Sequence, residues 1–225
     1  MKPLAFFALS TLAAFSAAQV TTKTIVARKA GYYEAKASHA VFATTPLGKL
    51  ANLTLASDAN RAIAQFKRES AGMDKPRYPY SFQQSNEVVF YSADLISVLT
   101  QIFWDTAGAH PNTSYTTQNF ALVNGVPKRI GMTNLLKPGI RPVQIDDLVI
   151  AKLRDLGASE VVDNNVMGLN AQQRDRFTIS QKGLHFIFPP YDMGYYAQGA
   201  FEVDLTWAQL SPFIDTKGIL KGVAR

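Results

Sequence analysis

The chain of 225 residues is 47% apolar and 18% charged, the composition of a globular protein that buries its own core in one substantial domain or two small ones. It contains no cysteine, which excludes disulfides, thiolate metal sites and a cysteine nucleophile. The formal net charge of +6 comes from scattered basic residues rather than from a concentrated stripe, so we expect no nucleic-acid-binding surface. Two interpretations of this charge stay open: a solvated basic surface, or a weak attraction to anionic wall polymers or lipid headgroups.

The first 18 residues follow the order of a secretory signal peptide. Lys2 supplies the positive start, residues 4–15 are apolar but too short to span a bilayer of about 30 Å, and residues 16–18 are small. The alternative is an N-terminal core helix, which would show polar residues at helical spacing that this run lacks. We therefore predict cleavage between Ala18 and Gln19 and an exported chain, periplasmic or extracellular, with no transmembrane segment after the signal.

Residues 21–45 are rich in β-forming side chains and predict an extended region that ends before Pro46. A helix is predicted over residues 58–70, because apolar side chains recur there at helical spacing. Ser57 or Asp58 is expected to cap the start of this helix.

The middle of the chain predicts a run of strands. Residues 86–92 and 95–105 form two of them around a short turn, and the second is apolar on both faces, which is typical of a central strand in a covered sheet. Residues 114–123 alternate between two faces and end in a tight-turn signal at residues 124–125. A short strand and a one-turn helix are predicted within residues 126–139.

The strongest helical pattern lies in residues 143–159, with Gly157 placed as its stop. The side chains that step by three or four along its predicted inner face are Ile145, Leu148, Val149, Lys152 and Leu156.

A hairpin is predicted over residues 175–190, followed by a strand over residues 200–207. Alternation in both strands predicts one face in the core. The predicted inward residues are Leu184, Phe186, Phe188, Phe201, Val203 and Leu205. The two strands are joined by residues 191–200, a connection rich in tyrosine and glycine.

Together these elements predict an α+β fold, in which a single domain has a mostly antiparallel sheet with two main helices packed on it. The predicted division of the chain is a signal peptide over residues 1–18, an N-terminal extended segment over residues 19–34, and the α+β domain over residues 35–225.

Two motifs resemble a known family. The stretch "SVLTQIFWDTAGAHPNTSYTTQNFALVNGVPKRIGMTNLLKPG" is similar to the pattern "Sv…y.ytGGAHgnt…n.dl.tGk…l.dll.pg" of the RsiV-like extracellular domain family, a domain of unknown function that also forms the front part of PdaC-like peptidoglycan deacetylases. The stretch from Gly183 is similar to a second pattern, "gL.f.F.pYe.g.yA.G..ev.ip...l". Ala107-Gly108 replaces the usual double glycine, and Pro111 replaces a small residue. The resemblance implies the family fold over about residues 35–210, without implying sigma-factor control or deacetylation.

Two loops carry the candidate binding residues. His110 and Asn112 follow a predicted buried strand and could bind an anion or a sugar hydroxyl; the alternative is that His110 caps backbone groups in a turn. Tyr191, Tyr195 and Tyr196 combine an apolar ring with a polar tip, which suits a core lid as well as a sugar-binding or protein-binding surface.

No motif predicts catalysis. The three histidines His39, His110 and His185 are far apart in the sequence and none has a helical ligand partner, so we expect no metal and no cofactor. No nucleophile elbow, zinc-protease motif or phosphate loop is present, although a carboxylate pair such as Asp192 with Glu202 is an open alternative.

These observations favour an exported, non-catalytic binding domain of the cell envelope. One partner class is peptidoglycan or another anionic wall polymer, as the PdaC-like arrangement implies. The other is a protein: the resemblance to RsiV implies lysozyme sensing, and lysozyme inhibition is a related alternative for this chain. Because lysozymes of the common type are basic, the basic chain slightly favours the polymer. A wall-polysaccharide hydrolase or deacetylase is the third hypothesis.

Overall fold

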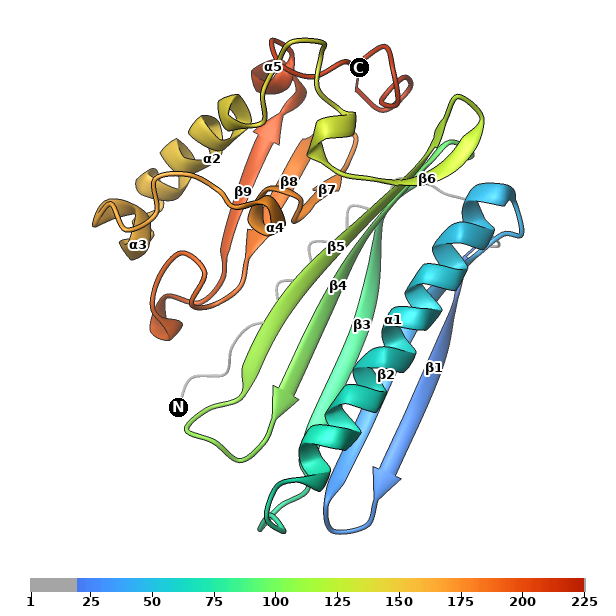
Figure 1. Cartoon of the computed structure of the whole chain (residues 1–225), viewed down its shortest axis with the longest axis vertical. Coiled ribbons are helices and arrows are strands. Elements are labelled where there is room, and N and C mark those ends of the chain that lie inside the picture. Colours follow the sequence, from blue (N-terminus) through green and yellow to red (C-terminus); the bar gives the residue numbers. More distant parts are fainter. Residues whose placement is uncertain (1–19, 225) are drawn as a thin grey trace.

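The computed structural model describes residues 20–224 and contains two sheets (Figure 1). The predicted signal peptide and its cleavage site between Ala18 and Gln19 lie outside these residues. The larger sheet has the strand order β1-β2-β3-β4-β5-β6. Its strands are β1 (Val20–Lys29), β2 (Tyr33–Phe42), β3 (Tyr80–Tyr91), β4 (Leu95–Asp105), β5 (Asn112–Val123) and β6 (Val126–Ile130).

The extended region predicted over residues 21–45 is confirmed as two antiparallel strands, β1 and β2, paired along their whole length. The predicted boundary at residue 35 therefore falls within this hairpin. β2 and β3 are parallel, and helix α1 (Pro46–Ala71) forms the crossover that parallel strands require.

Helix α1 begins earlier than the sequence pattern predicted. It starts at Pro46 rather than at Ser57 or Asp58, because Thr45 caps it by accepting a hydrogen bond from the Gly48 amide at 3.1 Å. Proline is well tolerated in the first helical turn, where its missing N–H would have no helical partner. Pro46 therefore both follows the extended region and begins the helix.

β4 is confirmed as a central strand, and β5 shows how the larger sheet is covered on both faces. Gln118 donates a hydrogen bond to Asp58 of α1, and Phe120 packs in the same cluster as α1. The alternate residue Asn119 points the other way and donates to the carbonyl of Phe177 at 2.8 Å. The larger sheet therefore lies between α1 on one face and the smaller sheet on the other.

The smaller sheet has the order β7-β8-β9. Its buried side chains belong to a hydrophobic cluster that also contains the buried face of α2 (Val143–Asp155). Its strands are β7 (Phe177–Ile179), β8 (Gly183–Phe188) and β9 (Phe201–Thr206), which confirms the predicted hairpin and the strand after it. All six side chains predicted to face the core in β8 and β9 are buried. Ile187 is buried as well, so β8 is covered more completely than strict alternation predicts.

The predicted helix is confirmed as α2 (Val143–Asp155), which packs on the smaller sheet. The prediction of its inner face is wrong at two positions. Lys152 and Leu156 are exposed, whereas Ile150 and Leu153 are buried. Two apolar stripes overlap in this helix, and only the packed sheet selects between them. Gly157 ends the helix as predicted, with φ of 73°, a conformation that favours glycine.

Short helices complete the fold around these elements. They are η2 (Met132–Asn134), α3 (Ser159–Val162), α4 (Ala171–Arg174), η3 (Tyr196–Gln198) and α5 (Trp207–Leu210). The architecture is the predicted α+β fold, with a large, mostly antiparallel sheet and two main helices. No helix among residues 20–224 is both long enough and apolar enough to cross a membrane.

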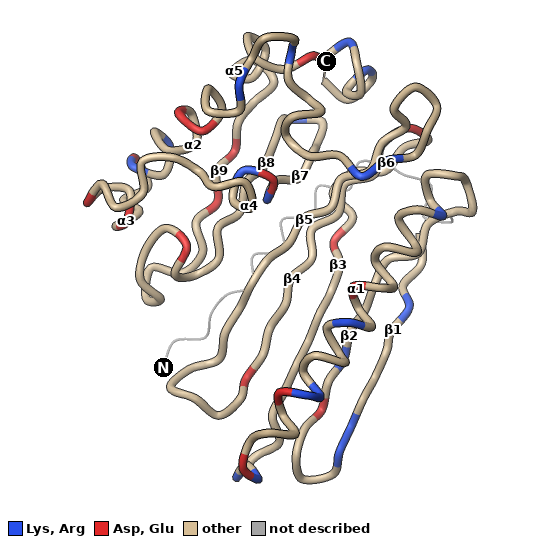
Figure 2. Tube along the Cα trace, in the orientation of Figure 1, with Lys and Arg blue, Asp and Glu red and all other residues tan. Residues whose placement is uncertain are grey.

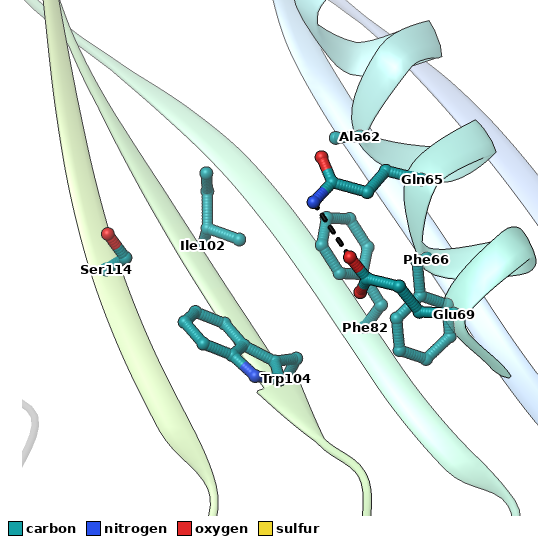
Figure 3. Close-up of a pocket in the computed structure, with 8 residues that line it drawn as sticks. All are labelled: Ala62, Gln65, Phe66, Glu69, Phe82, Ile102, Trp104 and Ser114. Carbon is teal, nitrogen blue, oxygen red and sulfur yellow. Dashed lines mark hydrogen bonds between the residues drawn. The ribbon is translucent and has the colours of Figure 1, made fainter. Parts of the chain in front are cut away.

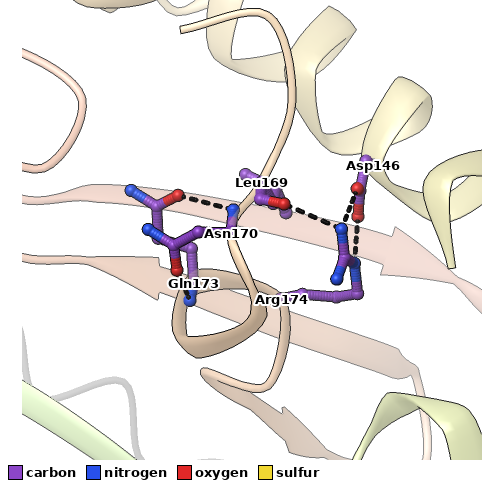
Figure 4. A network of polar contacts seen from close by, with 5 residues as sticks. All are labelled: Asp146, Leu169, Asn170, Gln173 and Arg174. Atoms are coloured by element: carbon purple, nitrogen blue, oxygen red, sulfur yellow. Dashed lines mark hydrogen bonds and ion pairs between the residues drawn. The ribbon is translucent and has the colours of Figure 1, made fainter.

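A partly buried ion pair joins α4 to α2 (Figure 4). Arg174 donates from Nε to Asp146 Oδ1 at 2.8 Å and from Nη2 to the carbonyl of Leu169 at 2.7 Å. The hydrogen bond to Asp146 raises the pKa of Arg174, so the guanidinium stays charged. Asp146 lies in the first turn of α2, and its ion pair with Arg174 links this helix to the segment that leads into β7.

Candidate functional site

His110 lies in the hairpin between β4 and β5 and meets the loop between β8 and β9. Its Nε2 is 3.1 Å from the hydroxyl of Tyr191, and its ring stacks on Tyr196 with centroids 3.6 Å apart. His110 Nδ1 is 3.0 Å from the carbonyl of Pro111, which can only accept a hydrogen bond. A neutral His110 therefore carries its proton on Nδ1 and accepts the Tyr191 hydroxyl at Nε2.

Tyr196 strengthens the same junction by donating from its hydroxyl to the carbonyl of Pro111 at 2.8 Å. The ring centroids of Tyr191 and Tyr196 lie 5.7 Å apart, within the range of aromatic pairs. Three of the residues predicted from sequence, His110, Tyr191 and Tyr196, are therefore in one cluster. His110 contacts a backbone carbonyl in this turn and also packs with two tyrosine rings.

The tyrosine loop is held against the rest of the fold by polar contacts on its far side. Glu160 donates its amide to the carbonyl of Met193 at 3.1 Å. The hydroxyl of Ser159 donates a hydrogen bond to Gln198 Oε1 at 2.7 Å, and Gln198 Nε2 donates to the carbonyl of Gly157 at 3.0 Å. These contacts fix the loop while Tyr191 and Tyr195 remain exposed.

Tyr191 and Tyr195 are the exposed tyrosines of the loop, at 60% and 61% of their surface. Tyr191 has φ of 74°, an uncommon value for a bulky residue, which costs conformational energy and is more frequent at functional sites. We refer to His110, Tyr191, Tyr195 and Tyr196 as the His110–tyrosine surface.

Asn112 does not join the His110–tyrosine surface. It pairs with Trp104 across β4 and β5, and directly opposed residues share one face of a sheet. Trp104 lies on the α1 face, so Asn112 points to the side opposite the smaller sheet. The sequence placed His110 and Asn112 in one loop, but Asn112 is already the first residue of β5.

Asp192 and Glu202 have different partners, which does not favour the carboxylate pair considered from sequence. Asp192 forms an ion pair with the buried Arg176. Glu202 lies 3.8 Å from His185 Nε2, and Asp204 lies 2.9 Å from His185 Nδ1. Within residues 20–224, no group of three or more histidine and acidic side chains is arranged to hold a metal ion.

Sequence interpretation missed the neighbourhood of His185. Burial of the phenol raises the pKa of Tyr115 on β5, and the negative charge of Glu202 raises it further. Tyr115 and Glu202 therefore belong to one electrostatic environment, although they come from different sheets. His185 and Asp204 are directly opposed in the β8–β9 register. This register cannot be read from the sequence, because a long connection separates the two strands.

A groove lies on the opposite face of the larger sheet, between α1 and strands β3 to β5 (Figure 3). Its volume is about 330 Å³. The residues that line it are Ala62, Gln65, Phe66, Glu69, Phe82, Ile102, Trp104 and Ser114. Gln65 donates to Glu69 at 2.8 Å along the helix, which leaves polar atoms of both side chains free to meet a ligand.

Comparison with known proteins gives a family match over one part of the chain and similar folds over most of it. Residues 133–208 match a family model described as "Protein of unknown function (DUF3298)". The matched segment includes the tyrosine loop and ends after β9, whereas His110 precedes it. Among curated proteins, no significant match is found.

Two solved structures are similar over most of the chain. One is a DUF3298 family member from Bacteroides fragilis, with 12% identity, a TM-score of 0.57, and coverage of 87% of this chain and 94% of that one. The other is a DUF3298 family protein from Pseudomonas aeruginosa, with 12% identity, a TM-score of 0.56 and the same coverage. At this identity the likeness shows a shared fold.

Proposed function

We propose that this chain is a non-catalytic recognition domain of the bacterial cell envelope that binds a wall polymer through the His110–tyrosine surface. The observation that carries the proposal is the exposure of Tyr191 and Tyr195, at 60% and 61%, on a loop held rigidly from behind. Rigid, exposed tyrosine rings offer contact area at a low cost in conformational entropy, and their hydroxyls add hydrogen bonds. Sugar rings of a glycan present both C–H faces and hydroxyls to such a surface.

The proposal includes export, with cleavage between Ala18 and Gln19, and the kinship with RsiV-like extracellular domains that the two sequence motifs suggest beyond the DUF3298 match. Export would bring the His110–tyrosine surface into the compartment that contains wall polymer.

The distribution of charge supports attraction to an anionic polymer. Residues 20–91 contain ten Lys and Arg but five Asp and Glu, whereas residues 92–225 contain twelve of each. Figure 2 shows basic residues along β1 and α1 and acidic residues around α2, α3 and β9. The basic excess therefore acts at long range from the part of the domain built by β1 to β3 and α1.

The same distribution supports a second candidate, a basic protein such as a lysozyme. Glu202 and Asp204 are exposed on β9, directly after the loop that carries the tyrosines. The net charge of the whole chain argued against a basic partner, but the half that holds the His110–tyrosine surface has no basic excess. Local acids beside exposed tyrosines would complement a basic surface.

The test is retention of the protein lacking residues 1–18 on purified sacculi, beside capture on immobilised lysozyme. Tyr195→Ala should lower retention on sacculi, whereas the control Tyr78→Ala, which removes a 70% exposed tyrosine before β3, should not. Retention should also fall between about 0.1 M and 1 M salt, because the Debye length falls from about 10 Å to about 3 Å. Capture by lysozyme alone would favour the second candidate. Slow deacetylation or cleavage of wall sugar without retention would favour an enzyme.

A further inference from the structure

We infer that the groove between α1 and strands β3 to β5 is a separate ligand site, which takes one or two pyranose rings of an uncharged saccharide with Trp104 as the stacking platform. This inference goes beyond the proposed function. The groove lies on the α1 face of the larger sheet, whereas the His110–tyrosine surface lies on the face of the smaller sheet.

The floor of the groove is apolar and aromatic. Trp104 and Ile102 alternate along β4 onto the same face and stay half-exposed there. Phe82 on β3 lies directly opposite Trp104 in the β3–β4 register. Its ring packs against Phe66 of α1, with the two ring centroids 5.2 Å apart. The floor is therefore fixed, and the indole of Trp104 is its main accessible ring.

The rim of the groove is polar on two sides. Gln65 and Glu69 project from α1, and Ser114 projects from β5 (Figure 3). Asn112 stands directly opposite Trp104 at the β5 side. The hydrogen bond from Gln65 Nε2 to Glu69 Oε1 leaves the second carboxylate oxygen, the amide oxygen and one amide hydrogen available.

This combination matches the two-sided chemistry of a pyranose. The C–H face of the ring carries partial positive charge and packs on the electron-rich face of an aromatic ring. The hydroxyls at the edge of the ring can donate to Glu69 and exchange hydrogen bonds with Gln65 and Ser114. A volume of about 330 Å³ is at the small end of ligand pockets, which fits one or two rings.

Other ligand classes fit less well. Among residues 20–224, no Lys or Arg lines the groove, and Glu69 would repel a phosphate or carboxylate. β4 is paired with β3 and β5 over Gln101–Trp104, so the floor offers no free backbone groups to an added peptide strand. An organic cation is the strongest competitor, because an aromatic ring beside a carboxylate also attracts ammonium groups.

Tryptophan fluorescence provides the test, because the chain has only two tryptophans and they differ in exposure. Trp207 is buried and donates to the carbonyl of Gln181, whereas Trp104 is half-exposed in the groove. Diacetylchitobiose, an uncharged saccharide of two pyranose rings, should produce a saturable change in emission that persists in Trp207→Phe and disappears in Trp104→Phe. Glu69→Gln should weaken binding about tenfold through loss of a charge-assisted hydrogen bond, whereas Glu87→Gln, an exposed acid elsewhere on β3, should leave it unchanged.

Each alternative result has a defined meaning. A response to tetramethylammonium without a response to the saccharide would overturn the inference in favour of a cation site. Loss of the response in His110→Ala or Tyr195→Ala would place the sugar on the His110–tyrosine surface and also overturn it. An intact response in these variants, together with failure of the protein to bind sacculi, would support the groove and reject the proposed function. Unchanged thermal midpoints would show that the Trp104 and Glu69 variants are folded.

Discussion

The imidazole of His110 and the phenol ring of Tyr196 stack with centroids 3.6 Å apart and planes within 17° of parallel. This contact joins the β4–β5 hairpin of the larger sheet to the loop between β8 and β9 of the smaller one. Thr117 and Asn119 form a second junction further along β5, through hydrogen bonds to the carbonyls of Asp175 and Phe177. The tyrosine loop is therefore positioned by both sheets.

We expect His110→Ala to loosen this loop without unfolding the domain. The substitution removes the stacking on Tyr196 and the hydrogen bond to Tyr191, which together should lower the free energy of unfolding by about 1–2 kcal/mol. Hydrogen exchange should accelerate in residues 189–200. Tyr195→Ala serves as the control, since it removes an exposed side chain, and equal acceleration in both variants would contradict the role of His110.

Ala107→Gly should stabilise the protein. Ala107 has φ of 57°, a left-handed conformation that costs roughly 1 kcal/mol for a residue with a Cβ atom. Glycine adopts it freely, so the urea midpoint should rise, although the greater entropy of glycine in the unfolded chain offsets part of the gain. Ala93→Gly, in the turn before β4, should not raise the midpoint. A lower midpoint for Ala107→Gly would contradict this prediction, because it would show that other interactions of the folded chain compensate for the strained backbone at Ala107.

Phe186→Ala should cost about 3–5 kcal/mol of unfolding free energy, because its side chain is fully buried at the centre of the smaller sheet. Leu53→Ala, at a 72% exposed position of α1, should cost much less. Chemical denaturation of both variants tests this prediction, and similar midpoints would mean that the two sheets do not unfold as one unit.

Asp146→Ala should destabilise the protein by about 1.5–3 kcal/mol, because it removes a charge-assisted hydrogen bond and leaves the partly buried Arg174 without its carboxylate. The exposed pair Arg28–Glu34 provides a matched comparison, and Arg28→Ala should cost at most about 1 kcal/mol. Thermal denaturation of the two variants measures the difference. A small effect of Asp146→Ala would indicate that water replaces the carboxylate.

Stability should fall at high pH through Tyr115. Its pKa is raised in the folded protein, first by burial and then by Glu202, so the unfolded chain ionises first as the pH passes about 10. The stability is therefore fully present below that pH and is lost above it. Between about pH 9 and about pH 11, the wild type should lose more unfolding free energy than Tyr115→Phe, whose ring cannot ionise. Glu202→Gln should reduce this difference, and parallel pH curves would contradict the assignment.

Local pattern was sufficient where the chain forms regular structure against one core. The alternation in β8 and β9 identified their buried faces, and Gly157 marked the end of α2, because each signal depends on neighbours in the sequence. The sequence also identified His110 and the three tyrosines as candidates, because their residue types combine apolar rings with polar atoms.

Tertiary structure decided what depends on packing between distant segments. It selected Leu153 over Lys152 for the inner face of α2, and Pro46 as the start of α1. It also placed Asn112 on the α1 face of the larger sheet and His110 beside the tyrosines, because the hairpin between β4 and β5 contributes to both faces of that sheet. Side-chain types are local properties of a chain, but the face on which they meet is set by strand register and by the layers that cover each face of the sheet.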